Sequence, residues 1–119
     1  MDTRELIETH HKAWTNGDFA TARSVLADDL DFQGSINRFS TADDFIGTLI
    51  RFRRMVTDVT LQESLFEKEC AALLYECSTD TPAGIIRFAE FFTVREGKIS
   101  GITLVYDATI LRGIAGTDE

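Results

Sequence analysis

The chain has 119 residues, of which 44% are hydrophobic and 27% charged, and it contains eight glycines and one proline. This length suffices for one packed core, so we expect a single domain over residues 1–119, and the composition excludes a disordered or low-complexity chain. Twenty acidic side chains against twelve basic ones give a net charge of −8. This excess of negative charge disfavours nucleic acid and anionic membrane surfaces as partners.

Several features of the sequence bear on its location and on bound groups. The longest unbroken apolar stretch covers residues 71–75, far below the roughly 18 residues of a membrane span. Residues 1–11 alternate charged and apolar side chains, unlike a signal peptide, so we expect a cytoplasmic protein. The two cysteines have neither further thiols nor suitably spaced histidines, so we expect no metal site and no disulfide framework. No nucleotide or cofactor motif is present, and we expect no cofactor.

The first residues predict two consecutive helices. Asp2 and Glu5 have the spacing of a capping box, which predicts a helix over Thr3–Thr15 that ends at Asn16-Gly17. Asp18 can cap a second helix, in which the apolar residues recur at helical spacing as Phe19, Ala22, Val25 and Leu26.

A short strand and a third helix are predicted next. Residues 30–34 alternate as a strand does and point Phe32 inward. Thr41 has capping spacing to Asp44, and the apolar stripe of the helix that follows consists of Phe45, Leu49, Phe52 and Val56.

The second half of the chain is rich in β-branched and aromatic residues and predicts four successive strands. Their expected ranges are Val59–Phe66, Cys70–Ser78, Ile85–Arg95 and Ile99–Leu111. Helices followed by antiparallel strands indicate an α+β domain with helices packed on one face of a strongly curved sheet.

His10 lies on the apolar stripe of the first predicted helix, four residues after Leu6 and four before Trp14. A histidine in this place is either a hydrogen-bonded core residue or an acid/base group that faces a pocket. The pattern alone leaves both interpretations open.

Glu90 is the one carboxylate on the even-numbered face of strand 85–95, whose other members are Ile86, Phe88, Phe92 and Val94. An ionised carboxylate is costly there, so it has a raised pKa, forms an ion pair across the sheet, or lines a pocket. Raised carboxyl pKa values supply enzymes with a general acid near neutral pH. Glu90 is therefore the sharpest candidate for a functional residue.

The turn at residues 95–98 decides which residues of the last strand share a face with Glu90. A three-residue loop with Gly97 in the left-handed conformation places Ile102, Leu104 and Tyr106 there. A two-residue loop places the alternate residues Thr103, Val105 and Asp107 there instead. We favour the three-residue loop because it gathers the apolar side chains on one face.

The order of predicted elements, together with the segments Trp14–Phe19, Leu26–Asp29 and Arg95–Ile99, resembles the nuclear transport factor two-like superfamily. Within it, the chain resembles the SnoaL-like branch, which is similar to polyketide cyclases and ketosteroid isomerases. The resemblance implies a cone-shaped curved antiparallel sheet with three N-terminal helices packed on its concave face. It also implies an open end that admits a small apolar molecule, and dimers formed through the sheet.

The ketosteroid isomerases imply roles for two residues. His10 falls where the isomerase has its oxyanion-binding tyrosine, and Glu90 falls near its protonated aspartic acid. The place of the general-base aspartate holds Gln33 or Gly34. The resemblance therefore does not support a steroid-isomerase mechanism.

Two functional hypotheses follow. In the first, the protein is a cofactor-free isomerase, cyclase or dehydratase-type enzyme acting on a small apolar carbonyl compound. His10 is its acid/base, Glu90 the orienting or proton-sharing partner, and Tyr106 a donor to an oxyanion. In the second, the same pocket binds a ligand without catalysis, which the missing general base favours. The residues expected to wall the pocket are Trp14, Phe32, Phe45, Phe88, Phe92, Ile102 and Leu104.

The odd-numbered face of strand 85–95 is the expected contact surface between two copies. It presents Arg87, Ala89, Phe91 and Thr93. An exposed Phe91 is unfavourable in a monomer, so we predict a homodimer through the sheet.

Overall fold

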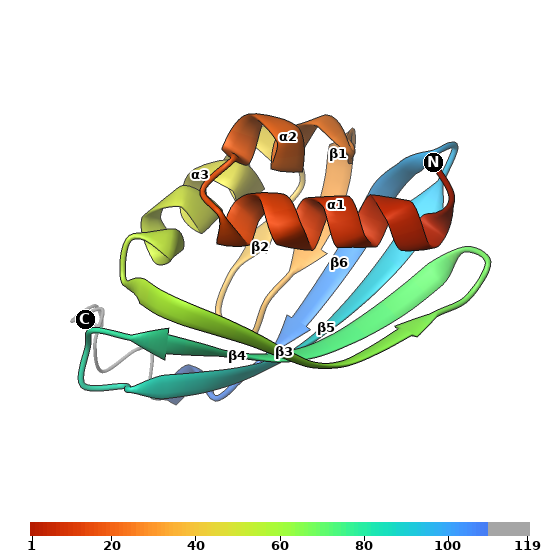
Figure 1. Cartoon of the computed structure of the whole chain (residues 1–119). Coiled ribbons are helices and arrows are strands. Elements are labelled where there is room, and N and C mark those ends of the chain that lie inside the picture. The colour runs from red at the N-terminus through yellow and green to blue at the C-terminus, as the bar shows by residue number, and fades with distance from the viewer. Residues whose placement is uncertain (110–119) are drawn as a thin grey trace.

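The structure, a computed structural model, describes residues 1–109 and shows an α+β fold in which helices cover one face of a curved, unclosed sheet (Figure 1). Its six strands have the order β2-β1-β6-β5-β4-β3, and all neighbours are antiparallel except the parallel pair β1 and β6. The elements are α1 (Thr3–Thr15), α2 (Phe19–Ser24), β1 (Leu26–Gln33), β2 (Arg38–Phe39), α3 (Ala42–Arg53), β3 (Val56–Phe66), β4 (Cys70–Thr79), β5 (Ile85–Arg95) and β6 (Lys98–Val105).

The predicted helix starts are confirmed. A carboxylate oxygen of Asp2 accepts a hydrogen bond from the Glu5 amide at 2.8 Å, and the Glu5 carboxylate accepts one from the Asp2 amide at 2.9 Å. This reciprocal pair is a complete capping box. Asp18 caps α2 and Thr41 caps α3 more simply, each through a side-chain oxygen that accepts a hydrogen bond from a backbone amide. No helix within residues 1–109 has the length and hydrophobicity needed to cross a bilayer.

Two helix ends differ from the prediction because strand pairing overrides local spacing. Helix α2 stops at Ser24, and Leu26 opens β1 opposite Ile99 of β6. Helix α3 stops at Arg53, and Val56 begins β3. The Arg53 guanidinium donates to the carbonyls of Thr15 and Val56, which ties the end of α1 to this junction. The two-residue strand β2 was not predicted, since so short a segment carries no period.

The turn between β5 and β6 has two residues, so the predicted three-residue loop is wrong. Arg95 pairs with Lys98, and both Glu96 and Gly97 have positive φ, at 53° and 75°. Both signs match a type I′ turn, which suits the twist of a hairpin. A bulge after Thr93 then adds one residue to β6 and shifts its register.

The bulge restores the predicted shared face. Phe92 lies opposite Ile102, and Glu90 lies opposite Leu104. The face assignment is thus confirmed, although a bulge rather than a longer loop produces it. Strand β6 ends at Val105, before Tyr106, instead of continuing to Leu111; residues 110 and 111 lie outside the described residues.

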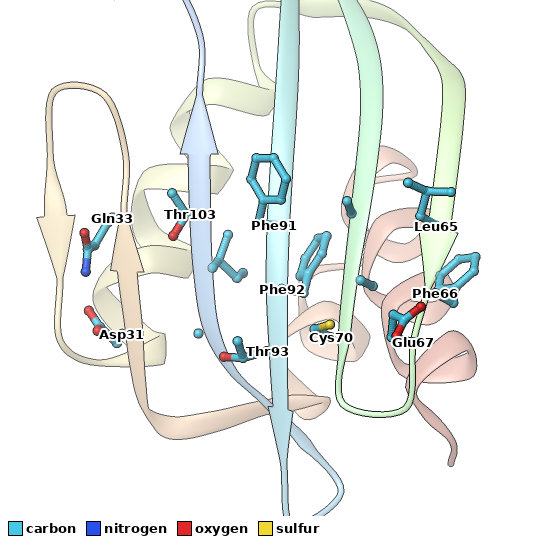
Figure 2. Close-up of a pocket in the computed structure, with 14 residues that line it drawn as sticks. Asp31, Gln33, Leu65, Phe66, Glu67, Cys70, Phe91, Phe92, Thr93 and Thr103 are labelled. Atoms are coloured by element: carbon cyan, nitrogen blue, oxygen red, sulfur yellow. The ribbon is translucent and has the colours of Figure 1, made fainter.

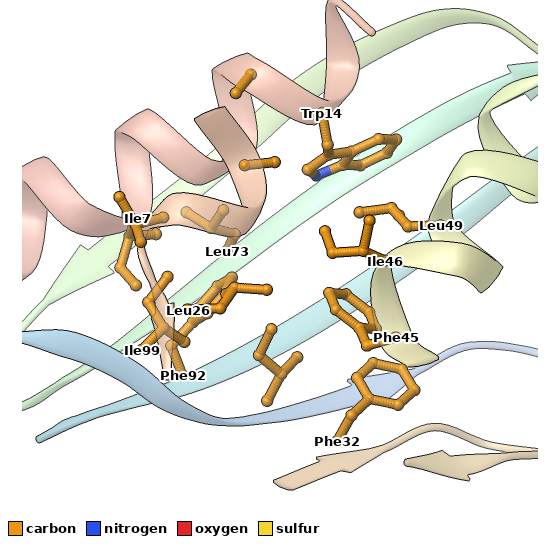
Figure 3. Packing of buried hydrophobic residues seen from close by; sticks show 14 of the residues in the cluster. Ile7, Trp14, Leu26, Phe32, Phe45, Ile46, Leu49, Leu73, Phe92 and Ile99 are labelled. Atoms are coloured by element: carbon orange, nitrogen blue, oxygen red, sulfur yellow. The ribbon is translucent and has the colours of Figure 1, made fainter. Parts of the chain in front are cut away.

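The hydrophobic core lies between the helices and the covered face of the sheet (Figure 3). Trp14 of α1 is 1% exposed and Phe92 of β5 is also 1% exposed, and Phe45 extends from α3 toward Phe32 of β1. Burying such aromatic side chains supplies much of the hydrophobic free energy of the fold. The packed layer leaves free space beside β5 and β6, and that space is where the functional residues must be sought.

Candidate functional site

Glu90 lies near the middle of β5 on the covered face, between Leu73 of β4 and Leu104 of β6. Its side chain is buried, with 3% of its surface exposed. Its Oε1 accepts a hydrogen bond from the hydroxyl of Tyr75 at 3.0 Å. Within residues 1–109, no Lys or Arg forms an ion pair with it, so the alternative of a cross-sheet ion pair is wrong.

Glu90 borders a partly enclosed cavity of about 100 Å³. The cavity lies where α1, α3, the segment between β1 and β2, and strands β4 to β6 converge. Aromatic side chains make most of its wall, and the carboxyl of Glu90 is the one carboxylate among the lining residues. The lining residues are Trp14, Phe32, Ile36, Asn37, Phe45, Thr48, Leu49, Phe52, Tyr75, Phe88, Glu90, Leu104 and Tyr106.

The surroundings of Glu90 give its carboxyl an unusually high pKa. Burial raises the pKa of Glu90 from 4.5 to about 7, while the hydrogen bond from Tyr75 acts in the opposite direction. Burial and the nearby Glu90 charge raise the pKa of Tyr75 well above 10, so Tyr75 stays a donor. Near neutral pH the carboxyl is therefore present in both forms and is able to take up or release a proton.

His10 lies at the closely packed end of the covered layer, beside Phe45 and Phe92. It is fully buried, and its Nδ1 lies 3.2 Å from the carbonyl oxygen of Ala22. Because a carbonyl only accepts, Nδ1 carries the proton of the neutral ring. Burial lowers the pKa of His10 to about 4. The ring packs near Phe45 and Phe92, at centroid distances of 6.2 and 6.4 Å.

Among residues 1–109, no hydrogen bond joins His10 and Glu90. His10 is absent from the cavity lining, and the hydrogen-bond partner of Glu90 is Tyr75. The predicted partnership of these two residues therefore has no direct hydrogen bond, and one turn of α1 separates His10 from Trp14, the residue of that helix that lines the cavity. Tyr106, the third predicted catalytic residue, does line the cavity.

Most of the predicted pocket wall is found around the cavity. Of the seven residues expected to form it, the ones that do are Trp14, Phe32, Phe45, Phe88 and Leu104. Phe92 and Ile102 do not line it, because they face each other two positions further along β5 and β6, toward His10. There they are packed in the core, at 1% and 2% exposure.

Tyr75 is the residue of the candidate site, in contact with Glu90, that sequence reasoning missed. It lies on the inward face of β4 beside Phe88, and alternation with the buried Leu73 and Cys77 was a usable signal. Two other lining residues, Ile36 and Asn37, belong to the irregular segment before β2, which has no period to read.

Comparisons with known proteins identify the family. The sequence profile of the SnoaL-like domain matches residues 7–102. The chain belongs to the SnoaL-like family. Its fold is that of the nuclear transport factor two-like superfamily, to which the predicted resemblance pointed. A search among curated proteins gave no match.

Solved structures agree with the family assignment. A Kribbella flavida protein is 26% identical to this SnoaL-like chain, and its TM-score is 0.85. The match covers 92% of the SnoaL-like chain and 89% of the Kribbella flavida protein. An NTF2-like protein from Cytophaga hutchinsonii is 16% identical and has a TM-score of 0.80. The match covers 93% of the SnoaL-like chain and 95% of the Cytophaga protein. An LEH-like epoxide hydrolase from M. tuberculosis is 19% identical and has a TM-score of 0.72. The match covers 94% of the SnoaL-like chain and 88% of the hydrolase. The last two likenesses establish the fold alone.

No carboxylate of the SnoaL-like domain stands where the isomerase resemblance places a general base. The side chains of Asp31 and Gln33 lie on the outer face of the sheet (Figure 2). Gly34 lies close to the side chains of Phe32 and Asn37, both of which line the cavity. Glu90 is therefore the one carboxyl group among the residues that line the cavity. Within the described range, no cluster of His, Cys, Asp and Glu is arranged to hold a metal ion.

The outer face of the sheet carries a second hollow, a groove of about 590 Å³ (Figure 2). Phe91 of β5 stands at its centre and is 51% exposed, and Leu65 of β3 is 68% exposed. Thr93 and Thr103 lie beside them on β5 and β6. This groove is apolar in its middle and is separated from the Glu90 cavity by the sheet itself.

Proposed function

We propose that this SnoaL-like domain binds a small, largely apolar carbonyl compound in the Glu90 cavity and transfers a proton within it, without a cofactor. One observation carries the proposal: a buried carboxyl, held by the Tyr75 hydroxyl and free of any cationic partner within residues 1–109, borders the free space of an aromatic cavity. Structural ion-pair networks also perturb carboxyl groups, but Glu90 belongs to none in the part of the chain that the structure describes.

The proposed chemistry is a proton shift next to the carbonyl. The Glu90 carboxylate takes a proton from the carbon beside the carbonyl group and returns it, so the negative charge moves to the ligand oxygen and back. Tyr106 lines the same cavity, and its hydroxyl is the proposed donor to that oxygen. Tyr75 positions the carboxyl. A base placed in this way contributes about 10²- to 10⁴-fold to a rate.

Exchange of ketone protons in D2O tests this proposal. Cyclopentanone is the probe, because the cavity is small, and loss of its α-proton signals is followed by NMR. We expect the protein to accelerate the exchange and Glu90→Gln to remove the acceleration. Glu76→Gln is the matched control, because Glu76 lies on the neighbouring strand and pairs with Arg87 instead of facing the cavity.

The alternative function is ligand binding without turnover. It is favoured by the absence, among the lining residues, of a second group that titrates near neutral pH beside Glu90. Cyclopentanone that binds in the cavity, with amide shifts at Phe88 and Leu104, but exchanges no faster than in buffer would establish this alternative. Absence of both binding and exchange would contradict both functions.

We further propose a homodimer through the outer face of the sheet. The support is the exposed apolar centre of the groove at Phe91 and Leu65, continued by Val105, which is 52% exposed. Apolar side chains grouped on an open face are usual at contacts between proteins. Light scattering at micromolar concentration should give twice the chain mass, and Phe91→Lys should halve it. A monomer mass for the unchanged protein would disprove the dimer.

A further inference from the structure

The residues that line the Glu90 cavity include a group that can carry negative charge but none that carries positive charge. Its lining residues include one carboxyl and no Lys, Arg or His. The guanidinium of Arg53 is directed elsewhere, to the carbonyls of Thr15 and Val56. When Glu90 is ionised, the protein therefore supplies no counter-ion for it within residues 1–109.

Aromatic rings make the wall around this carboxyl nearly continuous. Ring centroids of Tyr75 and Phe88 are 5.3 Å apart, and those of Phe88 and Tyr106 are 5.2 Å apart. Phe52 joins the wall at 5.6 Å from Phe88, and Trp14 lies 6.3 Å from Phe52. The faces of such rings carry partial negative charge and attract cations.

We infer that this cavity also binds small ammonium ions, compact apolar molecules with one protonated nitrogen. The inference rests on the proposed use of the cavity as a ligand site. It further specifies that the site accepts ligands with a positive charge. An ammonium group would supply the missing counter-ion of Glu90 while the rings surround its apolar part. A carboxylate ligand of the same size would instead meet a like charge and no donor cation.

Two properties of the site favour this binding. The Glu90 carboxyl is already buried in the free protein, so ligand binding adds little to its desolvation, and the ammonium group alone must leave water. The volume of about 100 Å³ is of the same order as that of a cavity of roughly 150 Å³ that accepts benzene, so small ring compounds are suitable occupants.

Three probes of equal size test the inference by NMR titration of the protein amides. These are cyclopentylammonium, cyclopentanone and cyclopropanecarboxylate, each with about six non-hydrogen atoms, compared at pH 8.5. At this pH Glu90 is ionised, since its pKa is about 7, and an alkyl ammonium, with a pKa near that of lysine at about 10.4, keeps its proton. The neighbouring Tyr75 and Cys77 stay protonated, because burial raises the pKa of both groups, that of Cys77 to about 12.

We expect the ammonium ion to bind at least tenfold more tightly than the ketone and the carboxylate not to bind. Glu90→Gln should abolish the tenfold preference while ketone binding persists. Phe52→Leu should weaken ammonium binding more than ketone binding, because it removes a ring face and keeps an apolar side chain. Glu76→Gln, on the other face of β4, should change nothing.

The outcomes separate this inference from the proposed function. Ketone binding without ammonium preference, or an ammonium preference that survives Glu90→Gln, would overturn the inference and leave the carbonyl site standing. Failure of all three probes to bind would overturn both. Binding of the carboxylate as tightly as the ammonium ion would also overturn the inference, because the one-sided charge of the wall is its basis.

Discussion

His10 and Glu90 are buried to nearly the same extent, at 0% and 3% exposure, but their surroundings differ. His10 is packed between Phe45 and Phe92 and borders none of the cavities described above. Glu90 borders free volume and holds a hydrogen bond from Tyr75. The comparison shows that burial of a polar group marks only a candidate. Free volume beside the group decides whether a ligand can reach it.

The largest expected difference between the two ends concerns the phenylalanines of β5. Phe92→Ala, at the His10 end, should lower the free energy of unfolding by about 3–5 kcal/mol, because it leaves a hole in packed core. It should leave cyclopentanone binding intact. Phe88→Ala, at the Glu90 end, should enlarge the cavity and admit larger ketones. Urea denaturation and NMR titration measure the two effects.

The two substitutions serve as controls for each other. Both remove a phenyl ring from the covered face of one strand, four residues apart. A Phe92→Ala protein with the altered ligand range expected of Phe88→Ala would contradict the separation of a closed end from a cavity end. Equal denaturant slopes for the variants would show that both unfold from similar folded states.

The pH dependence of stability should have opposite signs at the two ends. The pKa of Glu90 is raised from 4.5 to about 7, so its neutral form stabilises the fold below pH 4.5 and this contribution is lost as pH rises through 7. The shift corresponds to about 3 kcal/mol. Glu90→Gln should remove this decline, as measured by urea denaturation between pH 4.5 and 8. A decline that persists in the variant would contradict the assignment to Glu90.

The loss of stability at acidic pH tests the assignment of His10. Its pKa is lowered from 6.5 to about 4, so the neutral ring stabilises the fold above pH 6.5 and this contribution is lost as pH falls through 4. The expected loss is again about 3 kcal/mol. His11, whose pKa burial also lowers to about 4, adds a separate loss in the same range. His10→Gln should therefore flatten the acid decline in part, whereas an unchanged profile would show that His10 is not its source.

Periodicity predicted the fold well wherever one face of an element is buried throughout. The caps at Asp2, Asp18 and Thr41 and the inward face of β5 followed from local spacing. The bulge after Thr93 and the parallel pairing of β1 with β6 did not, because both depend on contacts between distant segments. Family resemblance supplied the overall architecture that local patterns left open.

The candidate site was predicted in part, for a related reason. Alternation places Glu90 on the apolar face of its strand, and this placement holds. Alternation does not say how far along that face the packing stays closed, which is why Phe92 was assigned to the cavity along with Phe88. The helical stripe likewise places His10 inside the protein without saying that α3 and β5 close around it.

The smallest expected effect concerns the hydrogen bond that holds Glu90. The Tyr75 hydroxyl donates to the carboxyl and so lowers the pKa of Glu90 against the effect of burial. Tyr75→Phe keeps the ring contacts with Phe88 and Trp14 but removes this donor. The pKa of Glu90 should therefore rise further, by roughly one unit, a size typical of one buried hydrogen bond. Titration of the carboxyl carbon by NMR measures it.

The same variant distinguishes positioning from packing. If Tyr75 acts through its hydroxyl, Tyr75→Phe shifts the pH profile of ketone exchange to higher pH, in step with the pKa of Glu90, while ketone affinity changes little. Glu76→Gln, one residue further along β4 on the outer face, provides the control and should leave the profile in place. An unchanged Glu90 titration in Tyr75→Phe would mean that burial alone sets the protonation of the cavity, and that the closed and open ends differ only in free volume.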